Sequence, residues 1–191
     1  PGFRPQQIRY AVEQGKHVFA EKPVAVDGPG VRSVLETCEL AKKKNLSVVS
    51  GLCWRYHKGM RETVQRIQDG AIGDIIAMQC NYNTRRPRTL TPRQPEWSDM
   101  EFQLRNWYFY AWLSGDHNVE QHVHSLDKMT WVLGDKYPVR ATGSGGRAAI
   151  AAEEPGHIFD HHAVHYDFEP SEGTIIPCYS YCRQQSGAKA E

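Results

Sequence analysis

The sequence predicts a parallel α/β region followed by an α+β region whose open sheet is mainly antiparallel. Residues 5–50 alternate between helical apolar spacing and short apolar runs, which is the pattern of α/β crossover units. From residue 75 onward, strand patterns predominate around a single helical segment. The composition, with 40% hydrophobic and 24% charged residues, is that of an ordinary globular protein.

The first helix and strand are predicted at residues 5–14 and 17–20. The strand ends at Glu21 and Lys22, and the following Pro23 keeps Lys22 extended. In open α/β sheets, ligands bind beyond the carboxyl ends of the strands. Glu21 and Lys22 are therefore candidate site residues, with an exposed ion pair as the alternative interpretation.

A second helix and strand are expected next, with Asp27 as the helix cap and the strand at residues 46–50. Trp54 and Arg55 follow this strand. An aromatic ring and a guanidinium at a strand end can lie over a bound ligand. A pair of packing side chains is the alternative.

The remaining elements are read from apolar spacing and turn residues. They are a helix at 57–69, a strand at 75–83 with Ile76, Met78, Cys80 and Tyr82 on one face, an irregular stretch at 84–106, a helix at 115–134, and strands at 139–147, 157–168 and 174–183. The irregular stretch carries several arginines, including Arg105, which could reach a polar substrate; a mobile cationic loop is the alternative. The strand at 157–168 would carry His157, His161 and His165 on one face, with no role assigned to them.

The segment 115–127 holds three histidines and three carboxylates in thirteen residues. As one helix, it would place Val119, Val123, Leu126, Thr130 and Leu133 against a core and His117, Glu120, His124 and Asp127 on the opposite face. A carboxylate four residues before an imidazole can orient it as a general base. Glu120 and His124 have this spacing, although a solvated helix face with incidental histidines would look similar.

A metal site is the rival interpretation of the same segment. Asp116, His117, His122 and His124 could bind a divalent ion. Against this, His122 lies off the face shared by the other histidines, and Lys128 and Met129 stand where a His-x-His metal site would need a glutamate. We therefore assign no metal ligands.

Net charge, hydropathy and cysteine content bear on the kinds of partner and on the cellular compartment. The net charge of +1 gives no indication of binding to nucleic acid or to an anionic membrane. No apolar run is long enough to span a bilayer. The five cysteines show no CxxC pair, which favours reduced thiols. The chain starts at Pro1 without a methionine, and we expect it to be a fragment of a longer protein, either cytoplasmic or, with an upstream export signal, periplasmic.

Four motifs together resemble the glucose-fructose oxidoreductase / inositol dehydrogenase (Gfo/Idh/MocA) family. They are Gly15 to Pro23 with its Glu-Lys-Pro end, Gly51 to Tyr56, Gly70 to Ile75, and the helix from Glu120 to Asp127 that continues to Trp131 and Gly134. Two positions depart from the family pattern, because Glu120 stands where Asp is usual and His122 where Gly is usual. The glycine-rich dinucleotide fingerprint is absent from this chain.

The resemblance implies a fold and an activity. Residues 1–56 would be the C-terminal remnant of an NAD(P)-binding Rossmann domain, and residues 57–191 a truncated substrate and oligomerisation domain. The intact protein would transfer a hydride between NAD or NADP and a hydroxyl-bearing carbon of a sugar or cyclitol. Without most of the cofactor site, the fragment itself is expected to be inactive. The open sheet would form a homo-oligomer; a non-catalytic oligomerisation module is a further alternative.

The resemblance also implies residue roles. Lys22, His124 and Glu120 would be catalytic, with His124 taking the hydroxyl proton and Glu120 orienting it. The expected cofactor-binding residues are Glu21, Lys22, Trp54 and Arg55. The expected substrate-binding residues are Asp127, Arg105 and Tyr108.

Overall fold

The computed structural model describes residues 1–151 and 153–184, which pack as two compact units. The first unit comprises residues 1–51, 88–120 and 153–158. The second comprises the described residues of 52–87, 121–152 and 159–191. Each unit has its own hydrophobic core.

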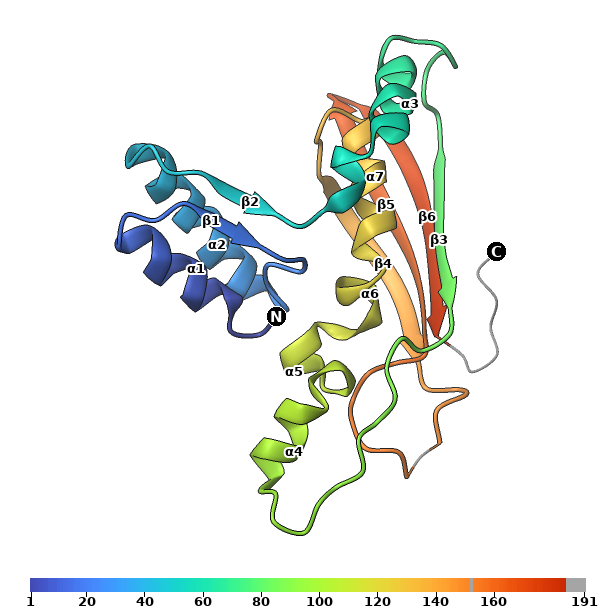
Figure 1. The fold of residues 1–191 in the computed structure, drawn as a ribbon. Coiled ribbons are helices and arrows are strands. Elements are labelled where there is room, and N and C mark those ends of the chain that lie inside the picture. The colour runs from blue at the N-terminus through green and yellow to red at the C-terminus, as the bar shows by residue number, and fades with distance from the viewer. Residues whose placement is uncertain (152, 185–191) are drawn as a thin grey trace. The chain divides into compact units, whose positions relative to one another are not determined.

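The first unit begins with the predicted α/β crossover (Figure 1). Its elements are α1 (Arg4–Glu13), β1 (Val18–Ala20), α2 (Gly28–Lys43) and β2 (Val48–Ser50). The two strands pair in parallel, as expected. Asp27 caps α2 by accepting a hydrogen bond from the Gly30 N–H at 2.7 Å. Ile8, Ala20 and Val34 form the buried centre of this region.

The other helices of the first unit are α4 (Asp99–Arg105), the 3-10 helix η2 (Trp107–Phe109), α5 (Ala111–Ser114) and α6 (Asp116–Glu120). The prediction of an irregular stretch through residue 106 is therefore wrong at its end. Ser98 caps α4 by accepting from the Glu101 N–H at 3.1 Å. The Ser-x-x-Glu spacing is a helix-start signal that the abundance of arginine and proline around it obscured.

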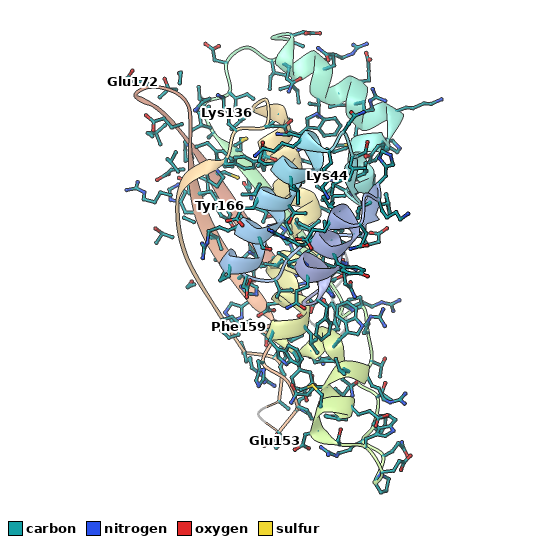
Figure 2. All side chains as sticks on the ribbon, turned by 90° about the vertical axis from the view of Figure 1, so that its left-hand side faces the viewer. Lys44, Lys136, Glu153, Phe159, Tyr166 and Glu172 are labelled. Atoms are coloured by element: carbon teal, nitrogen blue, oxygen red, sulfur yellow. The ribbon has the colours of Figure 1, made fainter. Side chains whose placement is uncertain are left out.

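The second unit is a four-stranded sheet with helices on one face (Figure 1). It contains η1 (Cys53–Tyr56), α3 (Lys58–Gln68), β3 (Met78–Thr84), α7 (Val123–Val132), β4 (Pro138–Gly146), β5 (His161–Ser171) and β6 (Thr174–Gln184). The strand order is β3-β6-β5-β4; β3 is parallel to β6 and the other pairs are antiparallel. The β5–β6 hairpin turns at Glu172 (Figure 2) and at Gly173, whose φ is +76°. The expected open, mainly antiparallel sheet is confirmed.

The core of the second unit lies between α7 and the sheet. Its buried residues are Met78, Cys80, Phe168, Ile176 and Cys178, and Leu126, Met129, Val132 and Leu133 of the α7 segment pack against them. Ile76 was expected on the same face but is 82% exposed, because it precedes β3 and is not part of the strand. Leu126 and Leu133 were predicted correctly.

The central segment is two helices, which corrects the prediction of a single helix at 115–134. The chain passes from α6 of the first unit to α7 of the second at Gln121 and His122. Here the His124 and Ser125 N–H groups bond to carbonyls three residues back instead of four. Val119, which was expected against the same core as Leu126 and Leu133, belongs to the first unit, where its side chain lies beside Gly115.

A buried carboxylate organises the loop before β5. One Asp160 oxygen accepts hydrogen bonds from the N–H groups of Ala148, Ala149 and Ile150 at 2.6–2.9 Å. The other oxygen accepts from His161 Nδ1 at 2.7 Å. The histidine face predicted at 157–168 is reduced to His161 and His165, because β5 starts at His161.

Candidate active site

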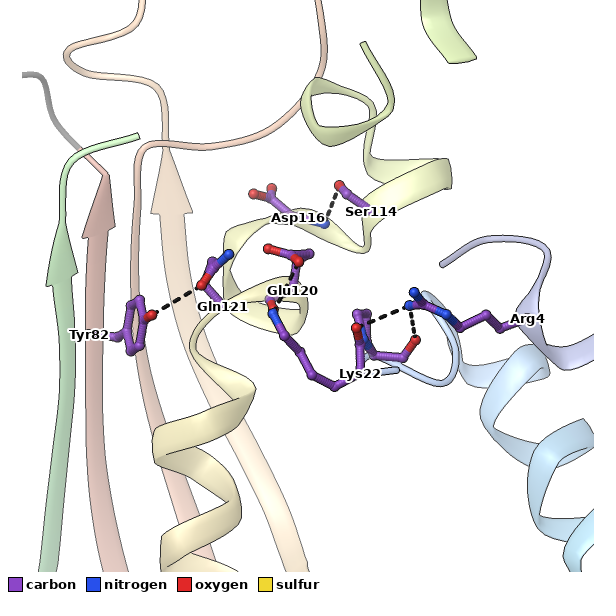
Figure 3. A network of polar contacts seen from close by, with 8 residues as sticks. Arg4, Lys22, Tyr82, Ser114, Asp116, Glu120 and Gln121 are labelled. Carbon is purple, nitrogen blue, oxygen red and sulfur yellow. Dashed lines mark hydrogen bonds and ion pairs between the residues drawn. The ribbon is translucent and has the colours of Figure 1, made fainter. Parts of the chain in front are cut away.

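Lys22 and Glu120, two of the three expected catalytic residues, meet in the first unit (Figure 3). Lys22 follows β1, and Glu120 ends α6. The Lys22 ammonium donates to the backbone carbonyl of Glu120 and, at 3.1 Å, to its Oε1. The side chains are only 14% and 9% exposed. A buried ammonium needs such a partner, and the pair holds the lysine head in one place.

Arg4 holds the turn that follows Lys22. Its guanidinium donates to the carbonyls of Lys22 at 3.1 Å and Pro23 at 2.8 Å (Figure 3), and the peptide bond between these two residues is cis. Burial lowers the pKa of Arg4, whereas the carboxylates of Glu21 and Glu120 act to raise it. Arg4 is not among the site residues predicted from the sequence. A signal was present, because a cation in the first turn of a helix opposes the helix dipole and so indicates another role.

Glu21 lies over the backbone at the end of β2. A Cβ at Gly51 would collide with the Glu21 carboxylate. The Gly51 N–H also donates to the Ala20 carbonyl at 2.9 Å, which keeps the ends of β1 and β2 together. Gly51 is therefore required for the close approach that positions the residue next to Lys22.

The entry to α6 is built from polar contacts at left-handed backbone positions. Gly115 and Asp116 have φ of +80° and +67°. The Asp116 N–H donates to Ser114 Oγ at 3.0 Å (Figure 3), and the Asp116 carboxylate accepts from the His117 N–H at 2.5 Å. His117 is fully buried. This tight turn sets the direction of the short helix that ends at Glu120.

Arg55 and Asp127 meet in the second unit. The guanidinium donates to both Asp127 oxygens at 2.8–2.9 Å and to Asp135 at 2.7 Å. It also lies over the Trp131 ring at 5.3 Å from the centroid. The hydrogen bond to Asp127, the strongest influence, raises the pKa of Arg55 further. The pair ties η1 to α7, and the expected roles of Arg55 with the cofactor and Asp127 with the substrate stay predictions.

A mainly apolar cavity of about 260 Å³ borders Asp127 in the same unit. Leu52, Val123, Leu126, Thr130, Pro138, Tyr166 and Phe168 complete its lining. Trp54 does not line this cavity. The Lys128 ammonium lies over its ring, with Nζ 4.7 Å from the ring centroid. The expected contact of Trp54 with the cofactor stays a prediction.

The other expected site residues lie in different surroundings. His124 is half-buried in the first turn of α7 in the second unit, so its pairing with Glu120 of the first unit stays a prediction. Tyr108 is 2% exposed and packs edge-on against Trp107. Arg105 forms an ion pair with Glu101 at 2.9 Å within α4. The substrate roles of Tyr108 and Arg105 also stay predictions.

The part of the chain that the structure describes contains neither a metal-binding cluster nor a membrane-spanning helix. Residues 1–151 and 153–184 contain no group of three or more His, Cys, Asp or Glu side chains arranged to hold a metal ion. Asp116 and His117 of the rival metal interpretation lie in the first unit, and His122 and His124 in the second. Within the same residues, no helix has the length and apolar character that crossing a membrane requires.

Known proteins share parts of this sequence, although no protein-family model matches it. An uncharacterized oxidoreductase of Streptococcus pneumoniae is 26% identical over 166 residues, which cover 87% of this chain and 40% of that protein. A 2,7-anhydro-N-acetylneuraminate hydratase of Mediterraneibacter gnavus is 24% identical with the same coverage. An inositol 2-dehydrogenase of Pseudomonas fluorescens is 29% identical over 127 residues, or 66% of this chain and 31% of that protein. The chain thus spans well under half the length of these relatives.

Solved structures share the fold. The myo-inositol 2-dehydrogenase of Lactobacillus plantarum superposes with a TM-score of 0.68 at 22% identity, covering 98% of this chain and 50% of that one. A gentamicin A biosynthesis protein in complex with NAD superposes with a TM-score of 0.70 at 16% identity, covering 97% and 47%.

A short parallel α/β layer followed by a mixed, mainly antiparallel sheet is the architecture of part of a dehydrogenase of the inositol dehydrogenase type. The chain is Gfo/Idh/MocA-like, as its motifs indicated. Its bacterial relatives include proteins named as an oxidoreductase and as inositol 2-dehydrogenases.

Proposed function

We propose that the whole protein to which this chain belongs is an NAD(P)-dependent oxidoreductase acting on a hydroxyl-bearing carbon of a sugar or cyclitol. The observation that carries the proposal is the buried Lys22–Glu120 pair at the end of β1. An ammonium has three N–H donors, and Glu120 receives two of those of Lys22. The third is the group that would bind the oxygen of a substrate hydroxyl or a cofactor ribose.

Lys22 and its surroundings fit a nicotinamide cofactor in charge and position. The lysine lies at the carboxyl end of a parallel strand, where α/β proteins bind dinucleotides. When bound, NAD or NADP would supply the hydride chemistry. The protein would then contribute two functions: Lys22 would orient the reacting oxygen, and a base would transfer the proton.

His124 is the proposed base. A neutral imidazole accepts a proton near neutral pH, and proton transfer by a positioned base is worth about 10²–10⁴-fold in rate. Glu120 would stabilise the resulting imidazolium. The Glu120 carboxylate would therefore serve two cations, since it already balances the charge of Lys22.

The test is a cofactor-reduction assay on the full-length protein. Purified protein is mixed with NAD or NADP and a panel of substrates that includes myo-inositol and aldoses, and formation of the reduced nicotinamide is followed by absorbance. We expect turnover with at least one cyclitol or sugar and a loss of about 10²-fold or more in His124→Asn. Turnover unchanged in His124→Asn would refute its role as the base.

A hydratase is the second candidate, because the relative with that name matches 87% of this chain, more than the inositol dehydrogenase does. The same assay separates the two. A hydratase converts 2,7-anhydro-N-acetylneuraminate without net formation of reduced nicotinamide, and product analysis by mass spectrometry detects this. Net reduction of the cofactor in step with substrate oxidation favours the dehydrogenase.

A further inference from the structure

We propose that His122 is a positioning residue that fastens the first turn of α7 to the sheet and so sets the direction in which His124 points. The inference rests on the proposed role of His124 as the base. His122 stands where the resembling family usually has glycine, and a glycine could not make this attachment. All the contacts involved lie within the second unit.

The His122 ring is anchored on two neighbouring strands. It is fully buried, and its Nε2 lies 2.6 Å from Ser180 Oγ on β6 and 3.8 Å from Cys80 Sγ on β3. Ser180 and Cys80 are opposite each other in the register of the parallel pair. A buried imidazole needs a hydrogen-bond partner, and the serine hydroxyl supplies one at a single fixed place.

Two further contacts hold the same turn. The Tyr82 hydroxyl donates to Gln121 Oε1 at 3.1 Å, and Ser125 Oγ donates to the Asn81 carbonyl at 3.2 Å. Attachments at positions 121, 122 and 125 therefore lie on both sides of His124 in the sequence. Since His122 makes no side-chain cap to the helix backbone, the sheet is what holds this helix start.

The buried position explains why a histidine suits this place. The imidazole is long enough to span from the helix start to the strand, and its rigid ring has only two side-chain torsions to fix. The Tyr82 ring packs edge-on against it, with centroids 6.2 Å apart. A change in this contact would tilt the first turn of α7, and a displacement of about 1 Å at a catalytic group can cost 10²-fold in rate.

The test uses variants of the full-length protein. Ser180→Ala removes the hydroxyl, and His122→Ala removes the ring. His122→Gln keeps a polar atom near the position of Nε2 and should rescue the contact. Ile176→Val is the control, because it removes a buried methyl group from the same strand without touching His122.

Two measurements are made on each variant. Hydrogen exchange reports the amides of residues 124–126, and NMR reports the Cε1–Hε1 signal of the His124 ring, assigned by its loss in His124→Gln. In Ser180→Ala and His122→Ala, these amides should exchange about fivefold faster, as loss of an ordinary hydrogen bond allows. The His124 signal should shift and broaden. His122→Gln should stay close to the wild type.

A purely structural role gives a different result. It would lower the melting temperature in Ser180→Ala, as in Ile176→Val, and leave the His124 signal and the exchange of residues 124–126 unchanged; that outcome would overturn the inference. Neither measurement depends on turnover. Failure of the proposed function, seen as an active His124→Asn enzyme, is thus distinguishable from failure of this attachment.

Discussion

Replacing Arg55 by methionine should destabilise the second unit by about 3 kcal/mol. Methionine fills similar space but carries no charge, so the 8% exposed carboxylate of Asp127 would lose the guanidinium that donates to both its oxygens. Removing one partner of a buried pair costs about 3–5 kcal/mol. The low end applies, because the Arg55 side chain is 27% exposed. Loss of the ion pair with Asp135, whose side chain is 59% exposed, should add less than about 1 kcal/mol to this destabilisation.

The assay is equilibrium urea unfolding of the full-length protein followed by tryptophan fluorescence, since Trp131 lies under the guanidinium. Asp127→Leu and the double variant with Arg55→Met complete a cycle, and the double variant should recover at least about 1.5 kcal/mol relative to the sum of the single changes. Arg66→Met is the control, because its ion pair with Glu62 is exposed. A loss below about 0.5 kcal/mol in Arg55→Met, or additive single changes, would refute the reasoning.

Three other changes test separate parts of the structure. Gly51→Ala should displace Glu21 and lower the melting temperature by several degrees in differential scanning calorimetry; an unchanged melting temperature would contradict the close approach. Burial raises the pKa of Asp160, but its hydrogen bonds outweigh burial and hold the pKa below the usual value. The stability that Asp160 provides is thus present above the unfolded pKa and lost as pH falls through the lower folded pKa. Asp160→Asn should lower the free energy of unfolding by about 2 kcal/mol at pH 7, measured by urea unfolding. The stability difference between the variant and the wild type should become smaller below about pH 4, and a difference that does not change with pH would contradict this role of the Asp160 carboxylate. Glu120→Gln should lower turnover and move the acidic limb of the rate profile to lower pH if its carboxylate stabilises protonated His124, and an unmoved limb would exclude that role.

The sequence was sufficient for the α/β order of residues 4–50 and for the two kinds of sheet, but not for the helices α4, η2 and α5. Apolar spacing and turn residues are local signals, and the Asp27 cap and strand β6 lie where such signals predict, whereas β5 starts at His161 and not at residue 157. The pairing of β3 with β6 in parallel is different, because it joins segments about a hundred residues apart and no local pattern encodes it.

The split of the central helix could not be predicted from periodicity. Residues 115–134 keep helical spacing through the break, so a helical wheel assigns His117, Glu120, His124 and Asp127 to one face. At Gln121 and His122, however, the α-helical hydrogen-bond pattern is interrupted, because the His124 and Ser125 N–H groups bond to carbonyls three residues back. Tyr82 and Ser180, on strands β3 and β6, stabilise this turn of the chain by hydrogen bonds to Gln121 and His122. These strands are far from the turn in sequence, so a local pattern cannot reveal the contacts.

The candidate site likewise has some features with a local sequence signal and others without one. Lys22 was recognisable from its place after a strand and before Pro23, and Glu120 from its spacing to a histidine. Their contact with each other depends on the fold of the first unit and had no local signal. Arg4 and Gly51 were missed because their roles are backbone contacts made across the unit.

The most direct test of the central claim is the turnover of Lys22→Met in the full-length protein, measured with saturating NAD or NADP and the best substrate. Since the change leaves Glu120 buried without its cation, Lys22→Met/Glu120→Gln is measured beside it to separate stability from chemistry. If Lys22 orients the reacting oxygen, both variants should lose about 10²-fold or more in kcat, while the double variant melts close to the wild type. A folded Lys22→Met protein with kcat within about threefold of the wild type would contradict the account.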